Sequence, residues 1–311
     1  MLQVLPVVVL SSVGVFLLLH LVPGDPVAVL AGPDATPETI QAMRQDLGLD
    51  KPLPVQYGMW LSRVVRGDFG RSYAYRRPVG ELIVQRIPAT VELALAGLTL
   101  ALLVAMPTGV MAAVRQGSAF DWLASTLSGF AIAIPNFWFG ILAITVFSLT
   151  LGWLPPGGMV ELTRDPVGGL RFLVLPAVTL ALNQAAVLSR FVKSSVLDVL
   201  YEDYVRTARA KGLSEPRITS RHVVRTALIP IATVLGLEFG RLLGGAVIVE
   251  SVFAWPGVGL LIIQGILHRD YPIVQATLLL LVITFVAVNL ITDLLYGFLD
   301  PRIRLSARRH S

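Results

Sequence analysis

The sequence has 311 residues, of which 55% are hydrophobic and only 14% are charged, and its net charge is +5. A soluble domain carries about 25% charged residues, so this composition excludes an ordinary soluble protein and indicates that much of the surface faces lipid. The sequence contains no cysteine, which excludes disulfides and cysteine-ligated metal. The basic residues lie between apolar segments, which favours membrane topology over nucleic-acid binding.

About six apolar segments are long enough to cross a membrane, because about 20 helical residues span about 30 Å of hydrocarbon. They cover roughly residues 2–22, 88–114, 122–150, 172–192, 223–250 and 273–299. The first lacks a basic start and a small-residue cleavage site, so it is interpreted as a retained span rather than a signal peptide. The expected fold class is an all-α integral membrane protein, with one membrane domain over residues 1–311.

Residues 23–87, between the first two predicted spans, form a loop that is expected to be folded. Thr36, Pro37 and Glu38 are typical of a helix N-terminus, and Gly48 is placed to end that helix. A second short helix is predicted over residues 55–66, with Gly67 beyond it. Its apolar side chains are expected to pack on the membrane domain or its interface: Tyr57, Trp60, Leu61, Val64 and Val65.

The basic residues of the connections predict the orientation of the chain. They concentrate in the connection over residues 193–222 and in the C-terminal tail, whereas the opposite short loops hold few. The positive-inside rule therefore predicts that residues 193–222 and both termini are cytoplasmic, and that residues 23–87 are extracytoplasmic.

The 193–222 connection contains a predicted short helix with acidic residues at its start, basic residues near its end and Gly212 to terminate it. Ala208 and Ala210 are small enough for a partner to approach the backbone, and Tyr204 and Val205 are expected to supply an apolar anchor. One interpretation is a coupling helix that docks on a cytosolic protein; the other is a solvated helix whose charges only set topology. The candidate residues are Glu202, Asp203, Tyr204, Val205, Arg206, Thr207, Ala208, Arg209, Ala210, Lys211 and Gly212.

The stretch Tyr204-Val-Arg-Thr-Ala-Arg-Ala-Lys-Gly212, followed by Arg221-His-Val-Val-Arg-Thr-Ala-Leu-Ile-Pro230, resembles the cytoplasmic signature of ABC-transporter permease subunits. It is most similar to the branch that imports dipeptides, oligopeptides, glutathione or nickel. The general signature begins Glu-Ala-Ala, whereas the matching residues here are Arg206-Thr-Ala208. Further matching stretches are Leu21-Val-Pro-Gly-Asp-Pro26, Leu47-Gly-Leu-Asp-Lys-Pro52, Gly67-Asp-Phe-Gly70, Ile134-Pro-Asn-Phe-Trp138, Leu151-Gly-Trp-Leu-Pro155, Leu243-Gly-Gly-Ala-Val-Ile-Val-Glu250, Phe253-Ala-Trp-Pro-Gly257, Asp293-Leu-Leu-Tyr296 and Leu299-Asp-Pro-Arg-Ile-Arg304.

This resemblance implies a multi-pass permease in a bacterial or archaeal inner membrane that imports di- or oligopeptides, or alternatively glutathione or a nickel chelate. It implies a sister permease, an extracytoplasmic solute-binding protein and two cytoplasmic subunits that bind ATP and Mg²⁺. The sequence has no G-x-x-x-x-G-K-[ST] phosphate-binding loop, so ATP hydrolysis is expected in those other subunits. The chain itself is expected to hold no catalytic residue, cofactor or metal and to bind lipid but no nucleic acid.

Ionisable residues within predicted spans are the candidates for the translocation path, because each costs about 2.5–3.5 kcal/mol on insertion scales. Glu238 and Arg241 stand at i, i+3 and could pair on one helix face, and Asp293 lies on the last span. They either face the path and meet a zwitterionic solute, or form a buried structural pair or reach the interface from the helix ends. Gly236, Gly240, Gly244 and Gly245 on the same span are expected to allow close helix packing.

Two other classes of function are weaker alternatives. A gradient-driven secondary transporter would predict inverted repeats and discontinuous helices, and an intramembrane enzyme would need a catalytic pair; the sequence indicates neither. The four histidines are scattered, without metal-ligand spacing. The aromatic stretches at Phe253-Ala-Trp-Pro-Gly257 and Trp153-Leu-Pro-Pro156 are interpreted as anchors at the membrane interface or, alternatively, as docking surfaces for the binding protein.

Overall fold

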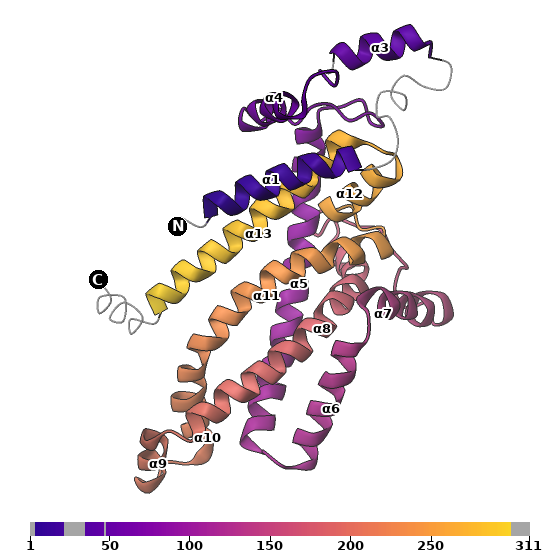
Figure 1. Cartoon of the computed structure of the whole chain (residues 1–311). Helices are drawn as coiled ribbons and strands as arrows, with labels where there is room; N and C mark the ends of the chain where they lie inside the picture. The colour runs from indigo at the N-terminus through magenta and orange to yellow at the C-terminus, as the bar shows by residue number, and fades with distance from the viewer. Residues whose placement is uncertain (1–3, 22–34, 47, 300–311) are drawn as a thin grey trace, which may run out of the picture. The chain divides into compact units, whose positions relative to one another are not determined.

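The computed structural model describes residues 4–21, 35–46 and 48–299, and this part of the chain is nearly all helical (Figure 1). Its one β-type contact is an isolated bridge between Arg71 and Pro78. The all-α prediction is confirmed. The helices are α1 (Val4–Leu21), α3 (Pro37–Asp46), α4 (Leu53–Val65), α5 (Val79–Val114), α6 (Ala119–Ala133), α7 (Asn136–Ala143), η1 (Ile144–Thr150), α8 (Pro166–Leu200), α9 (Asp203–Ala210), α10 (Glu215–Ile218), η2 (Thr219–Val223), α11 (Val224–Val252), α12 (Val258–Leu267) and α13 (Tyr271–Leu299).

Four helical stretches of the described residues are long and apolar enough to cross a membrane: Val79–Val114, Pro166–Leu200, Glu215–Val252 and Tyr271–Thr292. They coincide with four of the predicted spans. The first predicted span corresponds to α1, whose described apolar stretch, Pro6–Leu17, is shorter than a spanning helix. The count of six spans therefore stays a prediction.

The predicted span over residues 122–150 is broken rather than continuous. Its two halves, Ala119–Ala133 and Asn136–Thr150, are bent by 98°. Pro135 causes the break: it supplies no N–H to a continuing helix, and Ile134 before it is extended at φ −80° and ψ 123°. The sequence interpretation that found no discontinuous helix is wrong here. The broken pair forms either one bent span or a re-entrant loop.

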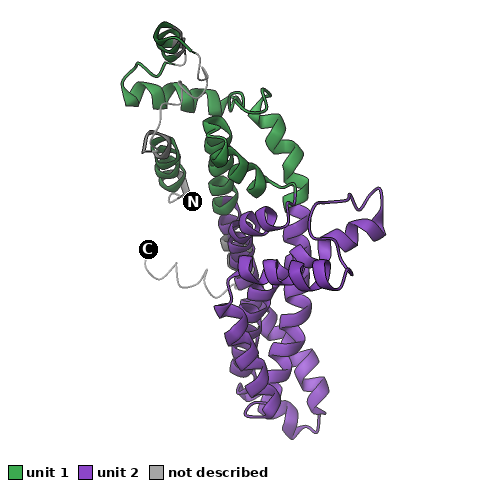
Figure 2. Ribbon diagram, turned by 90° about the vertical axis from the view of Figure 1, so that its right-hand side faces the viewer, with its two compact units in different colours: residues 1–90, 256–286 green, residues 91–255, 287–311 purple. Residues whose placement is uncertain are grey.

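The described chain divides into two compact units (Figure 2). Unit 1 comprises residues 1–90 and 256–286, and unit 2 comprises residues 91–255 and 287–311. Two of the three boundaries along the chain, 90/91 in α5 and 286/287 in α13, fall inside long helices, and the third lies between α11 and α12. The prediction of one membrane domain over residues 1–311 stays a prediction.

In unit 1, the predicted helices of the 23–87 loop are present as α3 and α4. The first begins after Thr36, and Gly48 follows its end with φ +69°. The second packs on α1 through aromatic contacts: the Phe16 ring lies 5.5 Å from that of Tyr57 and 5.8 Å from that of Trp60. Val65, by contrast, is 79% exposed, so its expected contact with the membrane domain or its interface stays a prediction.

Unit 1 also contains a buried carboxylate that ties the residues before α5 to the start of α13. We call this the Asp270 latch, comprising Asp270, Ser72 and Ala74. The Ser72 hydroxyl donates to Asp270 Oδ2 at 2.5 Å, and the Ala74 amide donates to the same oxygen at 2.9 Å. Asp270 is fully buried. Burial, and then the charge of Asp270, raise the pKa of Tyr73 to about 12.

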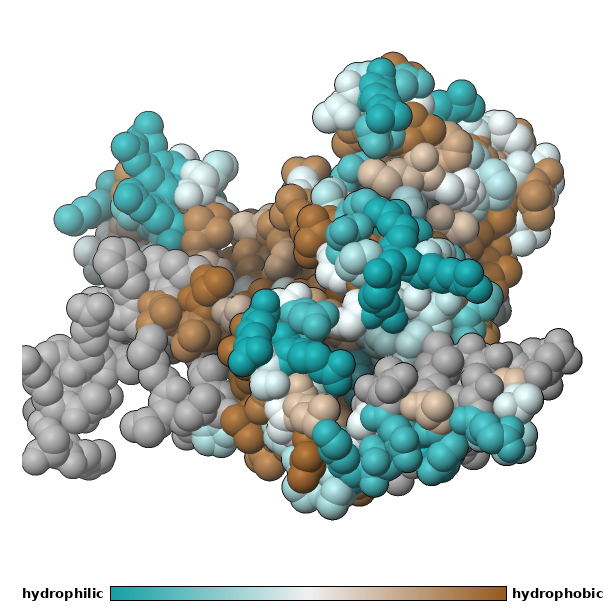
Figure 3. Space-filling model, turned by 90° about the horizontal axis from the view of Figure 1, so that it is seen from above, coloured by the Kyte–Doolittle hydropathy of each residue, from teal (hydrophilic) through white to brown (hydrophobic). Residues whose placement is uncertain are grey.

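Exposed side chains form hydrophilic groups and hydrophobic groups, as the space-filling view shows (Figure 3). In unit 1 the segment between α4 and α5 supplies several exposed arginines. These are Arg66, Arg71, Arg76 and Arg77.

In unit 2, α8 is the most buried of the candidate spans and packs against both α6 and α11. Small side chains of α5 and α8 meet in its core; these are Ala101, Ala105, Ala181 and Ala185, with Leu188 beside them. Lys193 of α8 forms an ion pair with Asp121 of α6. The core of unit 2 is therefore built from close helix contacts, and an ion pair also joins α6 to α8.

The two predicted aromatic anchors differ. Trp153 is 61% exposed, which suits a side chain at a membrane interface. Phe253 and Trp255 are fully buried, so the interpretation of that stretch as an interface anchor is wrong. The Phe253 carbonyl accepts a hydrogen bond from the Gly158 amide at 2.8 Å, which joins the end of α11 to the segment before α8.

Candidate functional site

The helix α9 begins and ends where the sequence predicts. Glu202 precedes it in an extended conformation, at φ −68° and ψ 146°, and Asp203 opens its first turn. Gly212 follows it at φ +78°, a left-handed conformation that a side chain strains. The Gly212 amide donates to the Arg209 carbonyl at 2.9 Å and the Leu213 amide to the Ala208 carbonyl at 3.3 Å. These two bonds form a Schellman motif, which satisfies the carbonyls at the end of the helix.

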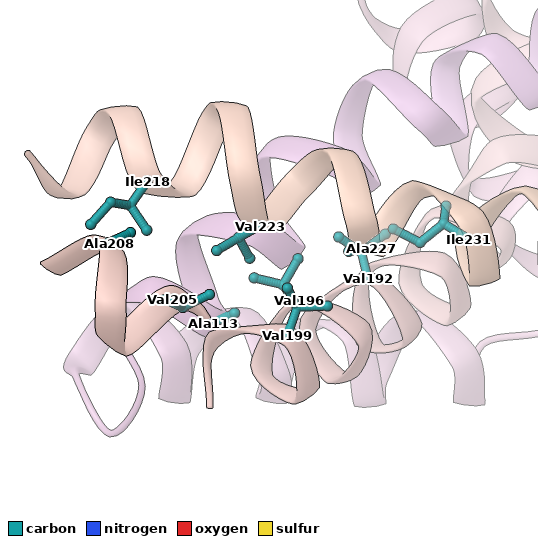
Figure 4. Packing of buried hydrophobic residues seen from close by; sticks show 10 residues of the cluster. All are labelled: Ala113, Val192, Val196, Val199, Val205, Ala208, Ile218, Val223, Ala227 and Ile231. Carbon is teal, nitrogen blue, oxygen red and sulfur yellow. The ribbon is translucent and has the colours of Figure 1, made fainter. Parts of the chain in front are cut away.

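One face of α9 is buried against the chain itself. Val205 has no exposed surface and Ala208 only 8%. We call the group to which they belong the α9 cluster: Ala113, Val192, Val196, Val199, Val205, Ala208, Ile218, Val223, Ala227 and Ile231. Figure 4 shows Ala208 beside Ile218 of α10, and Val205 near Ala113 of α5.

This packing corrects the expectation that Ala208 leaves room for a partner and that Val205 anchors α9 to one. Both side chains contact the chain's own core, so α9 is held to the ends of α8 and α11. An isolated helix of eight residues is marginal in water, and the α9 cluster supplies the apolar contacts that stabilise it. The i, i+3 spacing of Val205 and Ala208 was a signal of this buried face, but Ile218 and Val223 lie outside the helix and the sequence analysis missed them.

The opposite face of α9 is polar and exposed. Arg209 pairs with Glu215 of α10 through two contacts, Nε to Oε1 at 2.7 Å and Nη2 to Oε2 at 3.3 Å, and this bond raises the pKa of Arg209 further above its usual value. The Tyr204 hydroxyl donates to Thr226 Oγ1 of α11 at 3.2 Å. Exposed pairs of this kind contribute about 0–1 kcal/mol. The remaining exposed candidates are Glu202, Asp203, Arg206, Thr207, Ala210, Lys211 and Gly212.

The structure therefore brings all the candidates from residues 202–212 together in one two-faced element. Its inner face is apolar and joined to two spanning helices, and its outer face offers charges of both signs with an excess of basic residues. Such an element can transmit a displacement applied to its outer face to α8 and α11, since packed interiors resist deformation.

The second set of candidates lies within the spans of unit 2. Arg241 Nη1 donates to Glu238 Oε1 at 2.8 Å on α11, as the i, i+3 spacing predicted. The two side chains differ in exposure: 68% for Arg241 and 4% for Glu238. Asp293 lies in α13, and its side chain is outside the described part of the structure.

The predicted packing role of the glycines on α11 is supported at one position. A side chain at Gly236 would collide with Thr292 of α13, so this glycine permits close approach of the two helices. At Gly244, by contrast, an added Cβ atom would meet nothing within 4 Å. Gly236 is therefore packed against a neighbouring helix, whereas the space beside Gly244 is open.

Among the described residues there is no group of three or more His, Asp or Glu side chains that could hold a metal ion.

Comparison with protein families identifies the chain. The family model described as "binding-protein-dependent transport system inner membrane component" matches residues 105–305, which include α9 and both sets of candidates. The N-terminal model of the same kind of component matches residues 1–94. The chain belongs to this family. It is a multi-pass inner-membrane permease of an ABC importer.

Two relatives match this permease over nearly its whole length. A putative peptide transport system permease protein of Brucella abortus (strain 2308) is 44% identical over 302 residues, covering 97% of the permease and 96% of the relative. The glutathione transport system permease protein GsiC of Escherichia coli (strain K12) is 43% identical over 304 residues, covering 98% and 97%.

Solved structures support the fold. The permease resembles a chain of the MetNI methionine ABC transporter in inward-facing conformations, with a TM-score of 0.59 and 18% identity over 70% of the permease and 96% of that chain. It also resembles a chain of an amino acid ABC transporter solved with histidines, with a TM-score of 0.53 and 17% identity over 70% and 93% of the two chains.

Proposed function

We propose that the permease forms half of the translocation path of an ATP-driven importer for di- or oligopeptides or a related small solute, and that α9 is its coupling helix. In this proposal a sister permease forms the other half. Two cytoplasmic subunits bind ATP and Mg²⁺ and hydrolyse the nucleotide, and an extracytoplasmic binding protein delivers the solute. The basic residues of the α8–α11 connection support a cytoplasmic location for α9 and both termini.

The observation that carries the coupling role is the two-faced packing of α9. Its buried face contacts residues of α8 and α11, both candidate spans, so a movement of α9 is passed to helices that cross the membrane. A solvated helix that only set topology would need no such apolar attachment. Its exposed face is left for an ATP-binding subunit.

The solute class rests on the relatives. Proteins 44% and 43% identical to the permease are named for peptide and for glutathione transport, and glutathione is itself a tripeptide with two carboxylates. A peptide-like solute is therefore the favoured cargo. Glutathione and a nickel chelate are the alternatives within the same architecture.

We also propose that the charged residues of the spans, Glu238, Arg241 and Asp293, mark the translocation path. Arg241 is the candidate with the most structural support, because its side chain is 68% exposed on a candidate spanning helix. Lipid would oppose such exposure, whereas a water-filled path or a partner permits it.

The test is reconstitution of the permease with the subunits encoded beside it, in liposomes loaded with ATP. The expected result is uptake of trialanine or glutathione that needs internal ATP and the binding protein. Uptake that needs an ion gradient and proceeds without ATP would instead show a secondary transporter. Native mass spectrometry of the binding protein, purified with its bound ligand, identifies the cargo. A peptide mass supports the proposed solute, and the mass of a metal chelate would show that the solute is that chelate instead.

A further inference from the structure

Arg241 lies well inside α11, part of a helical stretch that is long and apolar enough to cross a membrane. The apolar helix α11 ends at Val252, about 16 Å further along its axis at a rise of 1.5 Å per residue, and begins still further away at Val224. The arginine side chain is too short to bring its charge to either end by snorkelling. A charge so far from both ends of a candidate span is expected to face a water-filled cavity or a partner group.

The guanidinium of Arg241 is held by a buried carboxylate on the same helix. Glu238 lies one turn earlier, its side chain is 4% exposed, and its Oε1 accepts from Arg241 Nη1 at 2.8 Å. This bond uses one of the five N–H donors of the guanidinium, and the head group otherwise faces outward. The carboxylate therefore fixes the orientation of a donor array whose free side points away from the core.

The space beside this donor array is open. A Cβ atom added at Gly244, on the next turn, would meet nothing within 4 Å, and Leu237 on the preceding turn is 43% exposed. A planar ligand group can thus approach the guanidinium without displacing a side chain of α11.

We propose that Arg241 binds a carboxylate of the solute as it passes, and that Glu238 is a positioning residue that does not itself touch the solute. The inference rests on the proposed peptide-like solute and assigns the two residues different roles, in place of a pair that meets both ends of a zwitterion. Paired N–H donors of a guanidinium match a carboxylate bidentately. The nearby Glu238 charge offsets much of the attraction, which keeps binding weak enough for the solute to leave.

The experiment uses the full reconstituted complex with trialanine and trialanine amide as probes, each at a concentration that saturates the binding protein. The permease variants are Arg241→Gln, Arg241→Lys and Glu238→Gln. Arg115→Gln, an exposed arginine outside α11, is the matched control for loss of one positive charge. Because the binding protein is the same throughout, differences between variants report the permease.

Arg241→Gln is expected to lower trialanine uptake by about tenfold or more, as for loss of a charge-assisted hydrogen bond, while Arg115→Gln changes it little. Arg241→Lys should retain part of the uptake. Glu238→Gln removes the opposing charge but keeps an acceptor oxygen for the guanidinium, so it should raise the preference for the acid over the amide, whereas a purely structural role would lower uptake of both probes equally. Co-purification of the sister permease should be the same in every variant.

Several results would overturn the inference. One is unchanged trialanine uptake by Arg241→Gln, and another is an equal loss of trialanine and trialanine amide uptake in that variant. A third is release of the sister permease from Arg241→Gln, which would show that Arg241 contacts that subunit. Failure of the proposed function looks different, because the unmodified complex would then import neither probe nor glutathione with ATP.

Discussion

The α9 cluster and the Asp270 latch each hold a connecting segment to a helix of the permease, but they do so by different means. The α9 cluster is apolar, and nearly all its members lie within residues 192–231 of the chain. The Asp270 latch is a buried polar contact between residues 198 positions apart. The difference shows that an apolar attachment close in sequence leaves a signal in the spacing of helix residues, whereas a polar attachment across the whole chain leaves none.

The largest expected effect comes from placing a charge in the α9 cluster. Ala208→Arg should destabilise the attachment of α9 by about 3–5 kcal/mol, as for an unpaired buried charge, and should release the ATP-binding subunits. Thermal unfolding and limited proteolysis of the α8–α11 connection measure this. Ala210→Arg, two residues away and exposed, is the matched control and should leave proteolysis unchanged; equal sensitivity of the two variants would contradict the packing of α9.

The Asp270 latch should respond to loss of its carboxylate. Asp270→Ala leaves the Ser72 hydroxyl and the Ala74 amide without their acceptor, which should cost about 2 kcal/mol. Proteolysis of the segment between α4 and α5 should accelerate while that of the α8–α11 connection stays constant. Ser72→Ala removes only one donor and should have a smaller effect. If Asp270→Ala left proteolysis unchanged, the latch would not stabilise that segment.

A smaller effect is expected where α9 ends. Gly212→Ala should destabilise α9 by about 1 kcal/mol, because alanine is strained at φ +78° although the space beside Gly212 is open. Gly212→Asn should cost less, since asparagine tolerates this conformation better. Thermal stability and ATP-driven uptake should follow the order Gly, Asn, Ala. Alanine matching glycine in both measurements would contradict the assigned helix end.

The last prediction is an effect seen only at high pH, and it concerns Tyr73, which lies next to the Asp270 latch. Its pKa in the folded chain is about 12, raised from 10, so the folded state binds a proton that the unfolded chain releases. Stability is thus present below pH 10 and falls as the pH rises from about 10 to about 12. Tyr73→Phe should flatten this fall in a thermal unfolding series. A pH dependence that is the same with phenylalanine would exclude Tyr73 as its source.

The parts of the permease that the sequence predicts are those with strong local signals. Apolar length identified four spanning helices, and the turn residue Gly212 identified the end of α9. The family resemblance was carried by short stretches such as residues 204–212, and the family models confirm it. These features depend on residues close together in the chain.

The features that the sequence did not predict depend on contacts made at a distance. The burial of Phe253 and Trp255 follows from a fold that encloses them, although their composition is equally typical of an interface anchor. The sequence alone does not distinguish Pro135, where the helix bends by 98°, from a proline such as Pro176, which lies inside the continuous helix α8. Glu238 and Arg241 were paired correctly, but only the structure shows that one is buried and the other exposed.

The most direct test of the coupling role is cysteine cross-linking, for which the cysteine-free chain is well suited. Single cysteines would be placed on the exposed face of α9 at Asp203, Thr207 and Ala210, and on its buried face at Val205. In the assembled transporter, a short thiol-reactive cross-linker should join the exposed positions to an ATP-binding subunit and leave Val205 unreacted. Cross-links to an ATP-binding subunit from elsewhere on the permease, with none from the three exposed positions, would contradict the assignment of α9 as the coupling helix.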